Sequence, residues 1–399
     1  MTKEKKRSSA LTGVILSVVL LALVVFLENS GLVPPTHILF TVLKKGAVYS
    51  LVAVSMNLLN GFTGLFSLGQ AGFMLLGAYT YAILTVPTNV RDSVYYLYGG
   101  SAIHFSLQEL FGSIFGNSGV GGAVSLVLGV LLGLILAGCV AALFAYLIGL
   151  PVLRLKSDYL AIATLGFAEI LRAVFQWQKL GPITNGANMI KSFPTFSSFN
   201  IKSGGKVVLY LSTFVPFLVS ILCIAVIILL INSTYGRAFK AIRDDEVAAE
   251  AMGIDLAHHK MLSFCISSFF AGIGGAMFAM FSNNAQAMPY TSAMTYEILL
   301  IVVIGGIGSI SGSVIGTFLY VACAEWWLFG LDNGQFLFIK APGVFRSGFR
   351  MVVFSVIIMI VVLFFRKGIM GDREFSWYGI IGFFQKLFKK KEKKEVASK

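Results

Sequence analysis

Hydrophobic residues in this chain are gathered into long runs, and polar residues are largely confined to the segments between them. The runs do not alternate apolar and polar positions, which excludes the strands of a membrane β-barrel. A run of about 20 apolar residues is long enough to cross a bilayer as a helix. The pattern predicts an all-α integral membrane protein, a polytopic bundle of about 10 passes, with roughly 8 to 11 allowed. The candidate runs lie near residues 11–27, 38–60, 66–86, 123–150, 159–177, 207–231, 261–282, 295–306, 313–330 and 348–365.

Glycines interrupt the eighth and ninth runs, and the eighth is short for a spanning helix. Glycine permits tight turns, and non-helical backbone at membrane depth is tolerated where it is buried in protein. We therefore expect Gly-broken helices here, and one of the pair is a candidate for a re-entrant segment. The glycines concerned are Gly305, Gly306, Gly308, Gly312 and Gly316.

Composition agrees with this fold, because 57% of the 399 residues are hydrophobic and only 12% are charged. The net charge of +13 comes from Lys and Arg at the chain ends and between the runs, without interleaved aromatics, so a nucleic-acid partner is not expected. The positive-inside rule places the N-terminus, the Arg154 and Lys156 turn, the 232–260 loop and the tail in the cytoplasm. Lys44 and Lys45, near the outer end of the second pass, depart from that rule.

The two ends of the chain are both basic. No small-residue cleavage site follows the apolar run at 11–27, so we interpret it as an uncleaved first span. The chain then divides into a transmembrane domain, 1–366, and a basic amphipathic tail, 367–399, with both termini in the cytoplasm. The tail is expected to lie at anionic headgroups, or to act as a plain positive-inside anchor.

A short helix is predicted within residues 244–253, in the only long charged insertion between two inward-facing helix ends. Asp244 and Asp245 suit its N-cap and first turn, and Gly253 suits its C′ position. A small apolar face, which would let another protein approach the backbone closely, is expected from Val247, Ala248, Ala251 and Met252.

This loop resembles the EAA coupling loop of bacterial ABC importer permeases, in which a short cytoplasmic helix docks on an ATPase subunit. Ala248, Ala249 and Gly253 match that pattern, but Val247 stands where the pattern has Glu, with Glu246 adjacent. The resemblance implies a coupling role for Arg243, Asp244, Glu246, Ala248, Ala249, Glu250 and Gly253.

Further stretches resemble the branched-chain amino acid ABC transporter permeases of the LivM type. They are residues 57–79, 153–172 with GPITNGANMI after them, ISSFFAGIGGAMFA from Ile266, and 305–316. The resemblance implies a permease that translocates Leu, Ile or Val by alternating access in a bacterial cytoplasmic (inner or plasma) membrane. Its implied partners are ATPase subunits, a second related permease subunit and an extracytoplasmic amino-acid-binding protein.

Polar groups within the apolar runs are candidates for the translocation pathway, because charge in a bilayer is costly and usually functional. Ser67 and Gln70 lie in a Gly-rich stretch, although related sequences often carry His at position 70. Glu169 and Arg172 share a helix face, so an ion pair is as plausible as a substrate contact. Our candidates for the pathway are Ser67, Gln70, Glu169 and Glu297.

Catalytic chemistry has no signature in the sequence. The histidines and cysteines make no metal-ligand spacing, and no G-x-x-x-x-G-K-[ST] loop occurs, so neither a cofactor nor ATP hydrolysis by this chain is expected. ATP hydrolysis would belong to separate subunits. The alternatives are a secondary transporter coupled to H⁺ or Na⁺, a passive channel or scaffold, or an ABC permease for urea, short amides, nucleosides or sugars.

Overall fold

Helices make up most of the chain that the computed structural model describes, which is residues 17–31, 33–116, 119–154, 157–203, 206–327 and short pieces between 335 and 371. Strands in this part are limited to two short hairpins, β1 (Ile201–Ser203) with β2 (Lys206–Leu209) and β3 (Gln335–Phe336) with β4 (Ile339–Lys340). The predicted all-α fold is therefore confirmed. The longer helices are Ser17–Asn29, α2 (Ile38–Asn57), α3 (Gln70–Thr85), α5 (Leu107–Phe115), α6 (Gly119–Val152), α7 (Ser157–Phe175), α9 (Phe214–Asn232), α10 (Thr234–Asp244), α12 (Leu256–Ser282), α13 (Ser292–Gly305) and α14 (Ile310–Ala322).

Short helical segments complete the described chain. Single π-helical turns extend α2 over Leu58–Phe62 and α14 over Cys323–Trp327. The remaining short helices are α4 (Thr88–Val94), α8 (Gly181–Thr184), α11 (Glu246–Ala251) and the 3₁₀ turns Tyr96–Tyr98, Gln178–Leu180 and Phe196–Phe199.

Four of the described helices are long and apolar enough to cross a membrane, and up to six spans result if each of two bent pairs counts as one. The four are Ile38–Phe62, Gly119–Val152, Phe214–Asn232 and Leu256–Ser282. The chain is therefore a polytopic membrane protein. The count of ten passes stays a prediction. The start of the first run, most of the tenth run and most of the tail lie outside the described residues.

Two predicted runs begin later as helices than the hydrophobic pattern indicated. The run at 207–231 starts with strand β2, and α9 begins only at Phe214, two residues before Pro216, which suits a first helical turn. The run at 66–86 starts as extended chain, and α3 begins only at Gln70. Hydrophobicity alone does not distinguish a short extended segment from the start of a helix, which explains both shifts.

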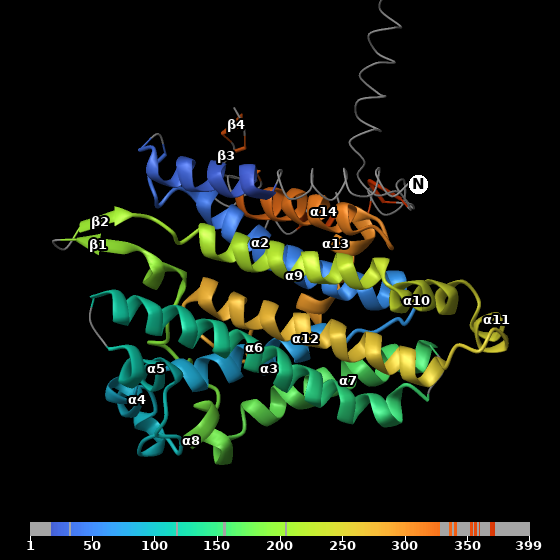
Figure 1. Cartoon of the computed structure of the whole chain (residues 1–399), viewed down its shortest axis with the longest axis horizontal. Coiled ribbons are helices and arrows are strands. Elements are labelled where there is room, and N and C mark those ends of the chain that lie inside the picture. The colour runs from blue at the N-terminus through green and yellow to red at the C-terminus, as the bar shows by residue number, and fades with distance from the viewer. Residues whose placement is uncertain are drawn as a thin grey trace, which may run out of the picture.

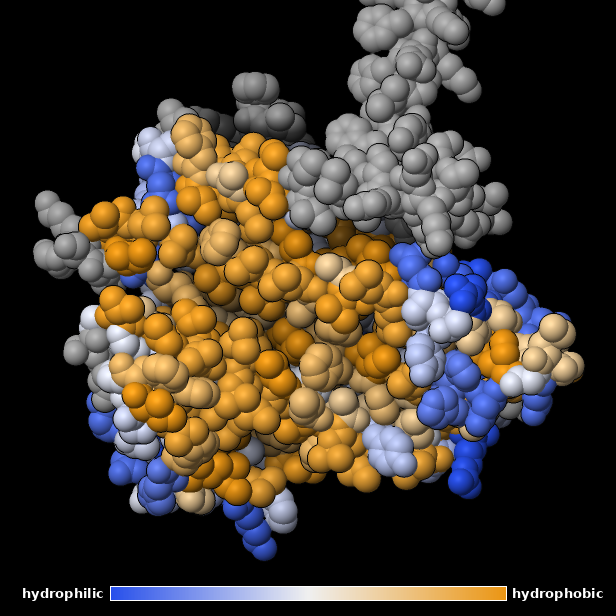
Figure 2. All heavy atoms as spheres, in the orientation of Figure 1, coloured by the Kyte–Doolittle hydropathy of each residue, from blue (hydrophilic) through white to orange (hydrophobic). Residues whose placement is uncertain are grey.

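Helix α12 lies at the centre of the bundle, against α2, α3 and α6 (Figure 1). Of its most apolar 18-residue stretch 72% is buried, against 28% for α9. The exposed sides of α6 and α9 contribute to the broad hydrophobic surface in Figure 2, the kind of surface that lipid covers. The difference in burial thus marks α12 as a central helix and α9 as a peripheral one.

Glycines allow α3 and α12 to pack backbone against backbone in the core of the bundle. A Cβ atom on Gly77 of α3 would overlap with the carbonyl oxygen of Gly272, and one on Gly275 of α12 would overlap with that of Met74. Small residues at such a crossing let two backbones approach closely, as is common among membrane helices. Glycine at these positions is therefore required by the packing of α3 on α12.

The two ends of the bundle differ (Figure 1). One end, here called the α11 end, carries α10 and α11, while hairpin β1–β2, α4 and α5 lie at the opposite end. There Arg91 is 2% exposed, and its guanidinium donates hydrogen bonds to the carbonyl oxygens of Ile83, Val86 and Ile103. This buried cation holds α4 and the segment before α5 against the end of α3.

Candidate functional site

Helix α11 has a complete hydrogen-bonded cap at each end. Asp245 is its N-cap, and one carboxylate oxygen accepts from the backbone N–H groups of Val247 at 2.9 Å and Ala248 at 3.1 Å. At the other end Gly253 has φ +84°, and the N–H of Ile254 donates to the carbonyl of Ala249, which is a Schellman motif. The predicted short helix is thus present, with Asp245 rather than Asp244 as its cap.

One face of α11 projects away from the rest of the protein. Val247 is 77% exposed and Met252 is 84% exposed, and both Ala248 and Ala251 are exposed beside them. These four residues form the α11 patch. In Figure 2 hydrophobic atoms lie at this tip among hydrophilic ones, separate from the broad hydrophobic surface. An exposed apolar patch rimmed by polar residues is a candidate contact surface.

The remaining candidate coupling residues divide between the surface and the interior. Asp244, Glu246 and Glu250 are exposed, and Glu246 forms an ion pair with Lys260 at 2.6 Å, which ties α11 to the start of α12. Ala249, by contrast, is 4% exposed and packs inward. It therefore lies outside the α11 patch, although it matches the loop pattern.

Arg243 is 37% exposed at its side chain, and its guanidinium lies beside two interruptions in the helices. The first break is residues 58–69, the π turn and the chain that follows it up to α3, and the second break is residues 306–309, between α13 and α14. The guanidinium donates to the carbonyl of Gly61 at 3.3 Å and to the carboxylate of Asp244 at 2.9 and 3.0 Å. Arg243 thus connects the chain before α11 with the first break.

Asn57, the last residue of α2 and directly before the first break, bonds the second break, and sequence reasoning missed it. Its side-chain oxygen accepts from the N–H of Gly308 at 2.8 Å, and its NH₂ donates to the carbonyl of Ser309 and the hydroxyl of Ser313. An amide within an apolar run, directly before a Gly-rich stretch, was the available signal. The second break turns the chain by 119°, which fits the re-entrant geometry expected for this pair.

Ser67 and Gln70 lie at the first break, and both are 3% exposed. The amide of Gln70 donates to the hydroxyl of Ser55 at 2.7 Å, and the hydroxyl of Ser67 accepts from the N–H of Gly69. The side-chain amide of Asn60 bonds both backbone groups of Ser67. These polar groups are engaged within the protein in this conformation, and their contact with a substrate stays a prediction.

The two candidate glutamates differ in their surroundings. Glu169 pairs with Arg172 at 2.8 Å and also accepts from the backbone N–H of Ser292, so it links α7 to the start of α13. Glu297 is exposed on α13. Lys45 of α2 forms an ion pair with Glu325, a partnership that the sequence did not reveal.

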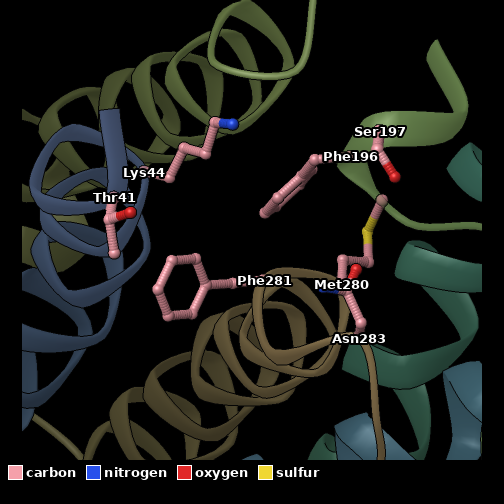
Figure 3. A pocket seen from close by; sticks show the side chains of 7 residues that line it. All are labelled: Thr41, Lys44, Phe196, Ser197, Met280, Phe281 and Asn283. Carbon is pink, nitrogen blue, oxygen red and sulfur yellow. The ribbon is translucent and has the colours of Figure 1, made fainter. Parts of the chain in front are cut away.

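A cavity of about 170 Å³ lies at the end opposite α11 (Figure 3). The rings of Phe196 and Phe281 face it, while the ammonium of Lys44 points away from Phe281 and donates to Ser212 at 2.7 Å. Ser212 in turn donates to Glu28, which is buried. The cavity thus combines an aromatic lining with a charged network at its edge. Its other lining residues are Thr41, Ser197, Met280 and Asn283.

Comparison with known proteins finds relatives over most of these elements. Residues 38–365, from α2 onward, match the family described as branched-chain amino acid transport system / permease component. The chain is 32% identical over 301 residues to the high-affinity branched-chain amino acid transport system permease protein LivM of Salmonella typhimurium and of Escherichia coli. That alignment covers 70% of this chain but 61% of each relative.

A more distant relative is the probable branched-chain amino acid transport permease protein LivH of Methanocaldococcus jannaschii, 27% identical over 71% of this chain and 82% of that protein. No solved structure matches the chain. The family match covers more than half of the sequence and includes both helix breaks and α11. The chain therefore belongs to the family of branched-chain amino acid transport permease components.

Proposed function

We propose that this chain is the membrane-spanning permease subunit of an ATP-driven importer for branched-chain amino acids, and that α11 couples it to separate ATPase subunits. The observation that carries the proposal is the α11 patch, a small apolar surface held by a fully capped helix at one tip of the bundle. A rigid helix with exposed Val, Ala and Met side chains suits insertion into a cleft of another protein.

The patch explains how a chain without an ATP-binding loop takes part in ATP-driven transport. ATPase subunits would close on each other when ATP binds, and the docked α11 would carry that displacement into the bundle. With an ATPase docked on α11, the α11 end would face the cytoplasm of a bacterial inner or plasma membrane, and the proposal puts both termini on that side as well. It is also the side on which Arg and Lys gather in the 232–260 loop.

Substrate and further partners are inferred from the relatives, whose names specify branched-chain amino acid transport. LivM and LivH are both permease proteins of such systems, so a second, related permease would pair with this chain. The end opposite α11 would receive leucine, isoleucine or valine from an extracytoplasmic binding protein. The cavity bordered by Phe196 and Phe281 lies at that end.

The test is a double substitution in the α11 patch, Val247→Glu with Met252→Glu. Burying a Val or Met side chain at an interface contributes about 1.5–3 kcal/mol, so two carboxylates there should weaken ATPase binding by more than about a hundredfold. The variant should insert and purify normally but lose the ATPase subunit during co-purification. Both side chains are exposed, so the fold of the permease should be unaffected.

Leu97→Glu is the matched control, because Leu97 is 56% exposed but lies at the opposite end of the bundle. It should retain the ATPase at the wild-type ratio. Undiminished co-purification of the ATPase with the double variant would contradict docking through α11.

A further inference from the structure

Arg243 occupies a position from which it contacts both helix breaks. Beyond its hydrogen bond to the carbonyl of Gly61, its Nη1 atom lies 3.3 Å from where a Cβ on Gly308 would be, and its Cγ atom lies 3.0 Å from where a Cβ on Gly64 would be. The aliphatic stem of Arg243 therefore borders Gly64, and its guanidinium borders Gly308.

Both of these glycines have left-handed backbone conformations, with φ +77° at Gly64 and φ +85° at Gly308. Any other residue would be strained at such a φ, and its side chain would also meet Arg243. Two segments more than 240 positions apart in the sequence thus pack against the same arginine side chain. Asn57, directly before the first break, also bonds Gly308 and Ser309 of the second break.

The connection from Arg243 to α11 is short and firmly held. Arg243 is the second-last residue of α10, which ends at Asp244. Asp245, which follows directly, is the N-cap of α11. The N–H of Asp245 donates to the carbonyl of Ala241 at 3.0 Å, so the two helices meet without a flexible linker. Phe239 and Ile242 are buried and anchor α10 against the bundle. A displacement of α11 therefore moves the guanidinium.

We propose that Arg243 is a positioning residue that transmits displacement of α11 to both helix breaks at once. The inference rests on the proposed function, because α11 is displaced only if an ATPase docks on it. A planar guanidinium suits this role, since its donors are fixed in direction and reach several acceptors together. A lysine in its place lacks the planar fork that holds Gly61 and Asp244 in one fixed arrangement.

The test measures how many leucine molecules are transported per ATP hydrolysed by the complete complex in proteoliposomes. Arg243→Gln should keep the ATPase bound and ATP hydrolysis running, while transport per ATP falls by about tenfold, within the range of coupling between distant sites. Arg243→Lys should give an intermediate ratio. Arg237→Gln, an exposed arginine on the same helix, should leave the ratio unchanged.

The outcomes separate this inference from the proposed function. An unchanged ratio in Arg243→Gln, or loss of the ATPase from that variant, would overturn the relay while leaving docking through α11 intact. If the wild-type complex transports leucine without hydrolysing ATP, the proposed function fails, and the relay fails with it. A folding defect would lower the amount of active complex but not transport per ATP, so the ratio distinguishes coupling from stability.

Discussion

Replacement of Gly275 by valine is expected to prevent the chain from folding into a stable bundle. A Cβ atom at this position would overlap with the carbonyl oxygen of Met74, and the carbonyl belongs to the backbone of α3, which cannot rotate away as a side chain can. Overpacking a core usually costs about 1–3 kcal/mol. Here two central helices would have to separate, so the loss should be larger.

The measurement is size-exclusion chromatography of the detergent-extracted protein. Gly275→Val should give aggregated or degraded material and no monodisperse peak. Gly166→Val is the matched control, because Gly166 also lies in a helix but a Cβ atom there would meet nothing within 4 Å. The control should elute as the wild type does. A monodisperse Gly275→Val protein at wild-type yield would contradict the packing of α3 on α12.

Replacement of Asn57 by leucine is expected to release the two helix breaks from each other. The N–H of Gly308 would lose the acceptor that it uses here, and the hydroxyl of Ser313 would lose a donor. An unsatisfied buried group costs about 1–3 kcal/mol, so the variant should unfold at lower temperature and transport little substrate. The Asn57 side chain also packs tightly against Gly61, since a Cβ atom on Gly61 would overlap with the Asn57 side-chain oxygen. The local backbone is therefore shaped around this amide.

Thermal unfolding in detergent and uptake in cells both test this expectation. Asn232→Leu is the control, since Asn232 is exposed at the end of α9 and its amide donates only to the carbonyl of Ile228. It should change neither quantity measurably. Normal unfolding temperature and uptake in Asn57→Leu would show that the two breaks are held together by other contacts.

The sequence predicted local features well because their causes are local. The runs of apolar residues indicated most of the long helices, and Asp245 and Gly253 marked the ends of α11 through capping chemistry that spans only a few residues. The Glu169 and Arg172 pair was predictable for the same reason, because three residues place both side chains on one face of a helix.

Contacts between distant segments could not be predicted in this way. Nothing near Arg243 in the sequence indicates that it bonds the carbonyl of Gly61, and Ala249 matched a surface pattern but packs inside. The second contact of Glu169, with the N–H of Ser292, joins segments 123 residues apart. Such contacts depend on how the helices pack, which hydrophobic periodicity does not specify.

Leucine uptake by the complete complex in proteoliposomes tests the central claim most directly. This chain would be reconstituted with its partner permease, the ATPase subunits and the binding protein, and labelled leucine would be followed against its gradient. We predict uptake that requires ATP, survives an ionophore that collapses H⁺ and Na⁺ gradients, and stops when the ATP-binding loop of the ATPase is mutated. Uptake that needs no ATP and is abolished by the ionophore would contradict the account and establish a secondary transporter instead.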